Sequence, residues 1–159
     1  FQPMVFRLAF RLLCDEDEAR DITQETFVKV WLSLKTYNRK NRFSTWLYKI
    51  TCNTCYDRLR SLYHSPLDNE ADYSVSVNIS SDDNVELAVV NKQLRELILR
   101  YTDELSPRQR LIFTLRDIEE LDVPEVQTIT GLSAGIIKTT LYLARKNIRN
   151  KMNQIDAGL

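Results

Sequence analysis

Apolar residues recur at helical spacing along most of the chain. In the first half, Ile22, Thr26 and Val30 form one stripe, and polar residues occupy the faces between them. Asp15 followed by Glu18 is a capping-box pattern that starts this helix. The 159 residues include three glycines and four prolines, too few to separate the many short strands of a β fold. The expected fold class is therefore all-α.

A polar, basic loop over residues 37–42 separates this helix from the next one in the first half. Ser44 or Thr45 starts the second helix, which continues through Leu47 towards Leu62. We therefore expect the first half to be a small helical bundle.

The second half carries clear helix start signals. We expect one helix over residues 87–101, and another that starts with Ser106 as its N-cap and Pro107 in its first turn. Asp122 and Glu125 form a further capping box, which starts a short third helix.

A stop signal and a new start follow that short helix. Gly131 ends it, because this type of C-terminal cap needs a positive φ. Ser133 then caps the last helix, which runs from Ala134 to about Met152. Two helices joined by a short turn that contains glycine make a helix-turn-helix.

Residues 64–84 differ in composition from both flanks. The segment has no Lys or Arg and is rich in Ser, Asn and Asp, so it buries too little apolar surface to offset the entropy cost of ordering. We therefore expect two small helical domains, residues 1–63 and 85–159, joined by a flexible acidic linker.

The charges of this neutral chain are unevenly distributed. A formal net charge of zero argues against a strong autonomous nucleic-acid binder. However, residues 35–60 contain seven basic residues against Asp57 alone, and residues 138–151 contain five with no acid. The acids gather in residues 15–25, 68–86 and 117–125. The function has to account for these two basic clusters.

Charged residues interrupt every apolar run well before membrane-spanning length. Neither a signal peptide nor a lipidation motif is visible, so we expect a cytoplasmic protein. Since the chain opens with Phe1 and not Met, we expect a few native residues to precede it.

The three cysteines form no disulfide spacing, which suits a reducing compartment. Cys52 and Cys55 lie mid-helix, and we expect small buried core residues there; metal binding or redox sensing is the alternative. A glycine-rich phosphate loop and a nucleophile elbow are both missing, and His64 is the only histidine. We therefore expect neither an enzyme nor a site for a metal, a cofactor or a small-molecule substrate.

The last predicted helix carries the most informative surface. The N-terminal part of the second helix of a helix-turn-helix enters the major groove of DNA. We expect some side chains to contact base edges and others to neutralise phosphates, the alternative being a solvated basic face. The base-contacting set is Lys138, Thr139, Thr140 and Tyr142, and the phosphate set is Arg145, Lys146 and Arg149.

Three stretches of the second half and three of the first carry a family resemblance. They are Leu105-Ser106-Pro107-Arg108-Gln109-Arg110, Phe113-Thr114-Leu115-Arg116-Asp117 and Leu132-Ser133-Ala134-Gly135-Ile136-Ile137-Lys138, then Asp21-Ile22-Thr23-Gln24-Glu25-Thr26-Phe27, Trp31 and Phe43-Ser44-Thr45-Trp46-Leu47-Tyr48-Lys49-Ile50. The chain thereby resembles extracytoplasmic-function (ECF) sigma factors, with region 2 in the first half and region 4 in the second. The resemblance implies a subunit that binds core RNA polymerase, recognises two promoter elements and helps to open the DNA.

In that family, the pattern at residues 21–31 contacts a coiled coil of the largest polymerase subunits. Its acidic and amide groups offer acceptors to a basic partner helix, although most such acidic runs are solvated faces. The residues expected to bind core polymerase are Asp21, Gln24, Glu25, Phe27 and Trp31.

The family's loop and helix that match residues 38–60 melt and recognise the −10 element. Single-stranded DNA is held by stacking on aromatic or planar groups and by phosphate neutralisation. Trp46 shares an apolar stripe with Ile50, so core packing is at least as well supported as stacking on a base. The residues expected to contact −10 DNA are Asn38, Lys40, Arg42, Lys49, Asn53, Arg58 and Arg60.

The resemblance assigns the last helix to the −35 element, with departures from the family's pattern. The family often has Ser-Arg after the lysine and another Arg before the Ala-Arg pair, where this chain has Thr139-Thr140 and Leu143. Fewer cations imply fewer phosphate contacts and a different or weaker base preference. Val123-Pro124 also replaces an aromatic residue and an acid that are common before the turn.

We therefore expect an ECF sigma factor whose partners are core RNA polymerase and promoter DNA, and the resemblance also implies an anti-sigma factor. Two alternatives stay open. One is a dimeric helix-turn-helix regulator, and the other is a sigma mimic that only titrates an anti-sigma protein. The missing cations at Thr140 and Leu143 favour the mimic, whereas Lys40, Arg42 and Lys49 oppose it.

Overall fold

The computed structural model describes residues 1–63, 92–93, 96, 98, 100–102 and 104–158. The predicted linker over 64–84 lies outside these residues, as does most of the helix predicted over 87–101, whose described positions up to residue 102 are helical. No strand occurs among the described residues, which confirms the all-α class. The elements with defined bounds are α1 (Gln2–Leu13), α2 (Glu16–Ser33), the short helix η1 (Leu34–Thr36), α3 (Phe43–Tyr63), α5 (Pro107–Phe113), the π-helical turn η2 (Thr114–Ile118), α6 (Val123–Thr130) and α7 (Ala134–Ala157).

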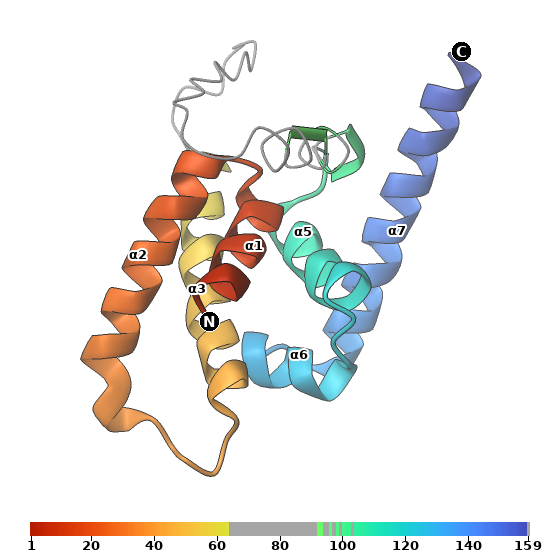
Figure 1. The fold of residues 1–159 in the computed structure, drawn as a ribbon. Coiled ribbons are helices and arrows are strands. Elements are labelled where there is room, and N and C mark those ends of the chain that lie inside the picture. Colours follow the sequence, from red (N-terminus) through yellow and green to blue (C-terminus); the bar gives the residue numbers. More distant parts are fainter. Residues whose placement is uncertain (64–91, 94–95, 97, 99, 103, 159) are drawn as a thin grey trace.

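Helices α1, α2 and α3 pack against one another and form the first half (Figure 1). The sequence analysis did not identify α1, whose apolar side is almost fully buried from Val5 to Leu12. It ends at Cys14 in the left-handed conformation, with φ 55°. The predicted cap of α2 is confirmed, since Asp15 Oδ1 accepts a 3.0 Å hydrogen bond from the Glu18 amide.

The predicted caps of the second half are also confirmed. Ser106 and Asp122 each form a complete capping box, with Gln109 and Glu125 respectively. The Ser133 side chain accepts a hydrogen bond from the Ile136 amide at the start of α7. Because these bonds satisfy amides that a helix start leaves unpaired, local sequence alone defines where these helices begin.

A π-helical turn follows α5. The Glu119 amide donates a 2.8 Å hydrogen bond to the Thr114 carbonyl, and Glu120 then reverses the chain with φ 56°. Such turns interrupt regular helices and frequently occur at functional positions. Here the turn places Asp117 next to Arg145 of α7. It also places Glu119 next to Arg11 of α1 and Tyr48 of α3.

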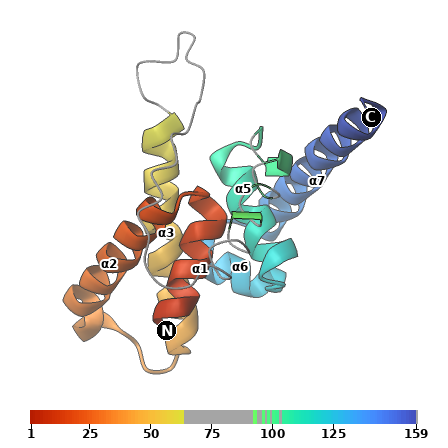
Figure 2. The ribbon, with the colours of Figure 1, turned by 45° about the horizontal axis from the view of Figure 1, so that its top comes forward.

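Helix α7 extends beyond the predicted end at Met152. It continues to Ala157, and its C-terminal part projects away from the other helices (Figures 1 and 2). Near its start, Ile137, Leu141 and Ala144 are buried, and their spacing places them on one side of the helix.

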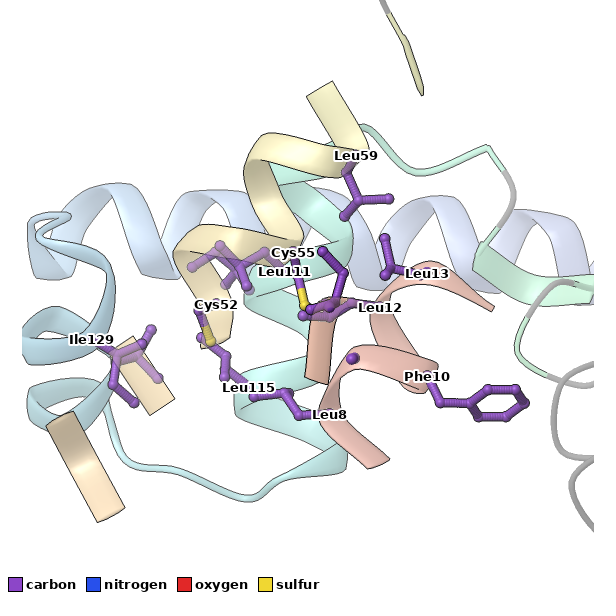
Figure 3. Packing of buried hydrophobic residues seen from close by; sticks show 14 of the residues in the cluster. Leu8, Phe10, Leu12, Leu13, Cys52, Cys55, Leu59, Leu111, Leu115 and Ile129 are labelled. Carbon is purple, nitrogen blue, oxygen red and sulfur yellow. The ribbon is translucent and has the colours of Figure 1, made fainter. Parts of the chain in front are cut away.

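The two halves share one apolar core. Figure 3 shows side chains of α1 and α3 meeting those of α5 and α6, and we call this contact the seam. Its members include Leu8 and Leu12 of α1, Cys52, Cys55 and Leu59 of α3, Leu111 of α5, Leu115 of η2 and Ile129 of α6. The prediction that Cys52 and Cys55 are buried is confirmed, with exposed fractions of 1% and 0%.

None of the helices within the described ranges is both long and apolar enough to cross a membrane.

The two glycines beside the turn of the helix-turn-helix should respond to alanine in opposite directions. Gly131 has φ +73°, whereas Gly135 lies inside α7, and an added Cβ would meet no atom within 4 Å at either position. We expect Gly131→Ala to lower the free energy of unfolding by about 1 kcal/mol, because a left-handed residue with a Cβ is strained. Gly135→Ala should raise it by roughly 0.5 kcal/mol through helix propensity. Urea denaturation measures both, and shifts of equal sign would contradict this account.

Candidate functional site

The exposed side of α2 is polar at its start and apolar at its end. Asp21, Gln24 and Glu25 are exposed, and Trp31 has 77% of its surface exposed. Helical spacing places two further side chains on the same side that the sequence analysis missed, Val28 (57% exposed) and Leu32 (74%). A cluster of large exposed apolar residues on one helix marks a surface for a protein partner. We call this set of six residues the α2 face.

Phe27 does not belong to the α2 face. It is half-buried and packs against the core cluster of Val5, Val30 and Leu47. Any contribution of Phe27 to partner binding is therefore through the position of the helix. The spacing signal for Val28 and Leu32 was present in the sequence, three and seven residues after Glu25.

One side of α3 carries most of its predicted polar residues. Lys49, Asn53 and Arg60 are exposed, and their spacing of four and seven residues places them on one side of the helix. Tyr56 lies on the same side and was not predicted, and the Arg60 guanidinium lies 5.9 Å from its ring centroid. These four residues form the α3 face, which combines cations, an amide and an aromatic ring.

Arg58 lies on another side of α3. Its Nη1 is 2.8 Å from Glu18 Oε2 on α2, and both side chains are about one third exposed. The pair joins the two helices inside the first half. The structure therefore separates Arg58 from the other predicted α3 residues and gives it a packing partner.

The loop before α3 exposes the predicted side chains Asn38, Lys40 and Arg42. Asn38 Oδ1 accepts a 3.0 Å hydrogen bond from the Lys40 amide and so holds the turn. Behind the loop, Trp46 packs with Tyr37 and Phe43, with ring centroids 4.9 and 5.6 Å away. Trp46 is half-buried in this aromatic cluster, and Tyr37 is a member that the sequence analysis did not single out.

One side of α7 gathers a second set of exposed residues. Lys138, Tyr142, Arg145 and Arg149 lie along it, and Tyr142 is 66% exposed. Thr139 and Lys146 are exposed on the adjoining side. A hollow of about 310 Å³ borders this surface and is lined by Lys138, Tyr142, Arg145 and residues of η2 and α6. We call these six exposed residues the α7 face.

Thr140 is not part of the α7 face. It is only 9% exposed and lies on the opposite side of the helix. In this arrangement its side chain is turned away from any ligand of that face, because residues two apart on a helix do not share a side.

Arg145 is held by an acid that the sequence analysis did not consider. Its Nε and Nη2 donate hydrogen bonds of 2.8 and 2.6 Å to the two carboxylate oxygens of Asp117 on η2. This hydrogen bonding raises the pKa of Arg145 above its ordinary value. The bidentate pair fixes the guanidinium next to Lys138 and Tyr142 while it offsets one positive charge of the face.

The buried thiols are poor candidates for metal or redox chemistry. Burial raises the pKa of Cys55 to about 12, and it also raises that of Cys52 well above its ordinary value. Both thiols are therefore protonated at neutral pH, whereas the thiolate is the metal ligand and the nucleophile. Among the described residues, no group of three or more histidine, cysteine or acidic side chains could hold a metal ion.

Comparison with known families gives matches over both halves. The model of the Sigma-70 region 2 family matches residues 1–64, and that of the Sigma-70 region 4 family matches residues 95–148. The ECF RNA polymerase sigma factor SigW of Bacillus subtilis is 24% identical over 168 residues, which cover 98% of this chain and 86% of the relative. The ECF RNA polymerase sigma-E factor of Escherichia coli K12 is 27% identical over 141 residues, which cover 85% and 74% respectively.

Two solved structures share the fold. The sigma factor RpoE of Bartonella quintana, solved with the anti-sigma factor NepR, superposes with a TM-score of 0.66 and 23% identity over 96% of this chain and 91% of its own. CnrH, solved with the cytosolic domain of CnrY, gives a TM-score of 0.62 and 22% identity over 96% and 82%.

Arg58 and Lys49 should differ in their effect on stability. Arg58→Ala removes the ion pair with Glu18, so we expect the free energy of unfolding to fall by about 1 kcal/mol. Lys49→Ala removes an exposed side chain and should change it by less than about 0.5 kcal/mol. Urea denaturation of both variants checks this, and an equal loss would mean that Lys49 also holds the fold.

Proposed function

The chain belongs to the sigma-70 family, in its ECF group of RNA polymerase sigma factors, and from this premise we propose that each of its three exposed faces has one ligand. The α2 face binds core RNA polymerase. The α3 face and the loop before it bind the −10 element, and the α7 face binds the −35 element. The observation that carries this proposal is that the three sets of residues lie on three different helices and, apart from the half-buried Tyr56, are exposed.

The α2 face suits a protein ligand. Trp31, Val28 and Leu32 expose apolar surface to water in the free chain. A partner that covers them removes this surface from water, and the hydrophobic free energy of burial stabilises the complex. Glu25 already pairs with Lys29 at 2.7 Å, so Asp21 and Gln24 are the more available acceptors. A basic helix of core polymerase that lies along α2 can satisfy both ends of the face.

The α3 face and its loop suit single-stranded DNA. Lys49 and Arg60 can neutralise phosphates, while Asn53 offers hydrogen bonds to a base edge. Tyr56 and the planar guanidinium of Arg60 supply surfaces on which an unstacked base can lie. Because Arg58 is paired with Glu18, we assign it to the support of α3 and not to DNA contact.

The α7 face suits duplex DNA. Lys138, Thr139 and Tyr142 lie in the first turns of the second helix of the helix-turn-helix, the part that enters the major groove. Arg145, Lys146 and Arg149 follow and can contact phosphates, although Asp117 offsets the charge of Arg145. We therefore propose that base recognition here depends on Lys138 and Tyr142, without Thr140.

The chain acts by binding and not by catalysis in this proposal. It works in the cytoplasm, where core polymerase transcribes bacterial DNA. An anti-sigma factor regulates it, and the support is that the similar sigma factor RpoE of Bartonella quintana was crystallised in complex with the anti-sigma factor NepR. A dimeric helix-turn-helix regulator does not account for the match to Sigma-70 region 2, whereas a sigma mimic shares both matches and is distinguished by the transcription test below.

Transcription from a pool of random promoter fragments tests the function directly. Core polymerase should initiate only when this protein is added, and the transcribed fragments should share two motifs at a fixed spacing. Lys49→Ala and Lys138→Ala should each reduce transcription by roughly tenfold or more, since each removes a direct contact to DNA. Binding to core polymerase without any initiation would instead identify a sigma mimic.

The assignment of the α2 face predicts a loss of core binding without a loss of stability. Trp31→Ala should raise the Kd for core polymerase by at least about tenfold, because it removes a large exposed aromatic anchor. Met152→Ala, at a 44% exposed apolar residue on α7, is the matched control and should leave the Kd unchanged. Fluorescence anisotropy of the labelled protein measures both. Equal Kd values for the two variants would remove the α2 face from the proposal.

A further inference from the structure

A short row of exposed side chains with apolar groups runs along α7 beside the cations of the α7 face. Ile136, Thr139 and Leu143 follow one another at intervals of three and four residues, which places them on one side of the helix. Ile136 has 43% of its surface exposed and Leu143 has 42%, and Thr139 is exposed between them. We call these three residues the α7 stripe. The proposed function assigns no ligand to Ile136 or Leu143.

The α7 stripe lies on a side of α7 that the fold leaves exposed. Helices α5 and α6 pack against α7 (Figure 1), and the buried residues Ile137, Leu141 and Ala144 form the packed side. Single exposed apolar residues are ordinary on protein surfaces, whereas an aligned row that borders a charged face marks a surface for a ligand. The stripe is therefore an extension of the α7 face.

The charge around the α7 stripe favours duplex DNA as its ligand. The four cations of the α7 face lie on the same exposed part of the helix, and residues 134–155 contain no acidic residue. A ligand that covers the stripe also meets these cations, which suits a polyanion with apolar groups between its two phosphate chains. Ile136 and Leu143 are about 10.5 Å apart along the helix axis, a length that fits within the major groove, which is about 12 Å wide.

Thymine is the base whose major-groove edge suits aliphatic side chains. Of the four bases it alone presents a methyl group there, on C5, next to its O4 acceptor. The other bases present hydrogen-bond donors or acceptors without a methyl group. An aliphatic side chain cannot satisfy these polar groups, and it displaces the water that otherwise does so. Ile136 and Leu143 therefore favour thymine over the other bases.

We propose that the α7 stripe contacts thymine methyl groups in the −35 element and that Leu143 is a specificity-determining residue of the chain. The inference rests on the proposed function of the α7 face and adds the chemical group that is recognised. Lys138 and Tyr142 then contact hydrogen-bonding base edges, while Leu143 contacts an apolar one. Leu143 contributes selectivity among bases where a cation would contribute affinity for phosphates.

Replacement of thymine by deoxyuridine removes the C5-methyl group alone and so tests this contact directly. The promoter found in the transcription test provides the −35 motif, and each of its thymines, on either strand, is replaced in turn. Holoenzyme made from core polymerase and this protein is offered equal amounts of the thymine and deoxyuridine duplexes at one salt concentration, and the bound ratio gives the ratio of the Kd values. Deoxyuridine should raise the Kd about fourfold at one position or more, as expected for the loss of one buried methyl group.

Three variants show whether Leu143 makes the contact. Leu143→Ala should bring the ratio of the two Kd values close to one at a sensitive position, whereas Leu143→Met keeps an apolar side chain and should retain the preference. Leu62→Ala is the matched control, because Leu62 is a 49% exposed leucine on α3, and it should leave the preference at about fourfold. Since Leu143 is exposed, its variants should keep the urea midpoint of the unsubstituted protein.

The possible failures are distinguishable. Equal binding of both duplexes at every thymine of the motif by the unsubstituted protein would overturn the inference and leave the stripe to a protein ligand. A motif without any A·T pair would overturn it as well. A preference that persists in Leu143→Ala would assign the methyl contact to another side chain and remove Leu143 from the proposal. Failure of the proposed function has a different signature, which is the absence of initiation by core polymerase with the unsubstituted protein.

Discussion

The rest of the structure depends on α3, because three sides of this 21-residue helix face three different surroundings. Leu47 and Thr51, both 0% exposed, face the interior of the first half. Cys52 and Leu59 face the seam, and Lys49 is exposed on the remaining side. Two sides are therefore committed to packing, and the third is the only one free to bind a polar ligand. The position of the α3 face follows from this constraint.

The seam gives the two halves a larger common core than either has alone. A domain of about 60 residues buries only about 60% of the surface of its unfolded chain and is marginally stable. Leu12, Leu111 and Ile129 belong to this common core, and their burial removes apolar surface of both halves from water. The formal net charge of zero is unlike that of a strong autonomous nucleic-acid binder.

The π-helical turn at Thr114–Ile118 connects two sets of contacts of the second half. Asp117 holds Arg145 beside the α7 face, and Glu119, two residues later, binds Arg11 and Tyr48 of the first half. Burial raises the pKa of Tyr48 well above its ordinary value, and the Glu119 carboxylate raises it further, so the hydroxyl remains a donor at neutral pH. A shift of this turn therefore moves a side chain of the α7 face and a seam contact together.

Local sequence determined the helix caps and the helical faces. Asp122 and Gly131 act within four residues of their partners, and face membership follows from spacing along one helix, so both could be predicted. The two-domain division with its linker at 64–84 stays a prediction, since that segment lies outside the described residues. The tertiary structure alone decided that Arg58 pairs with Glu18 and that the two halves share a core. Each of these depends on which helix packs against which, and that contact joins residues far apart along the chain, where periodicity and capping carry no information.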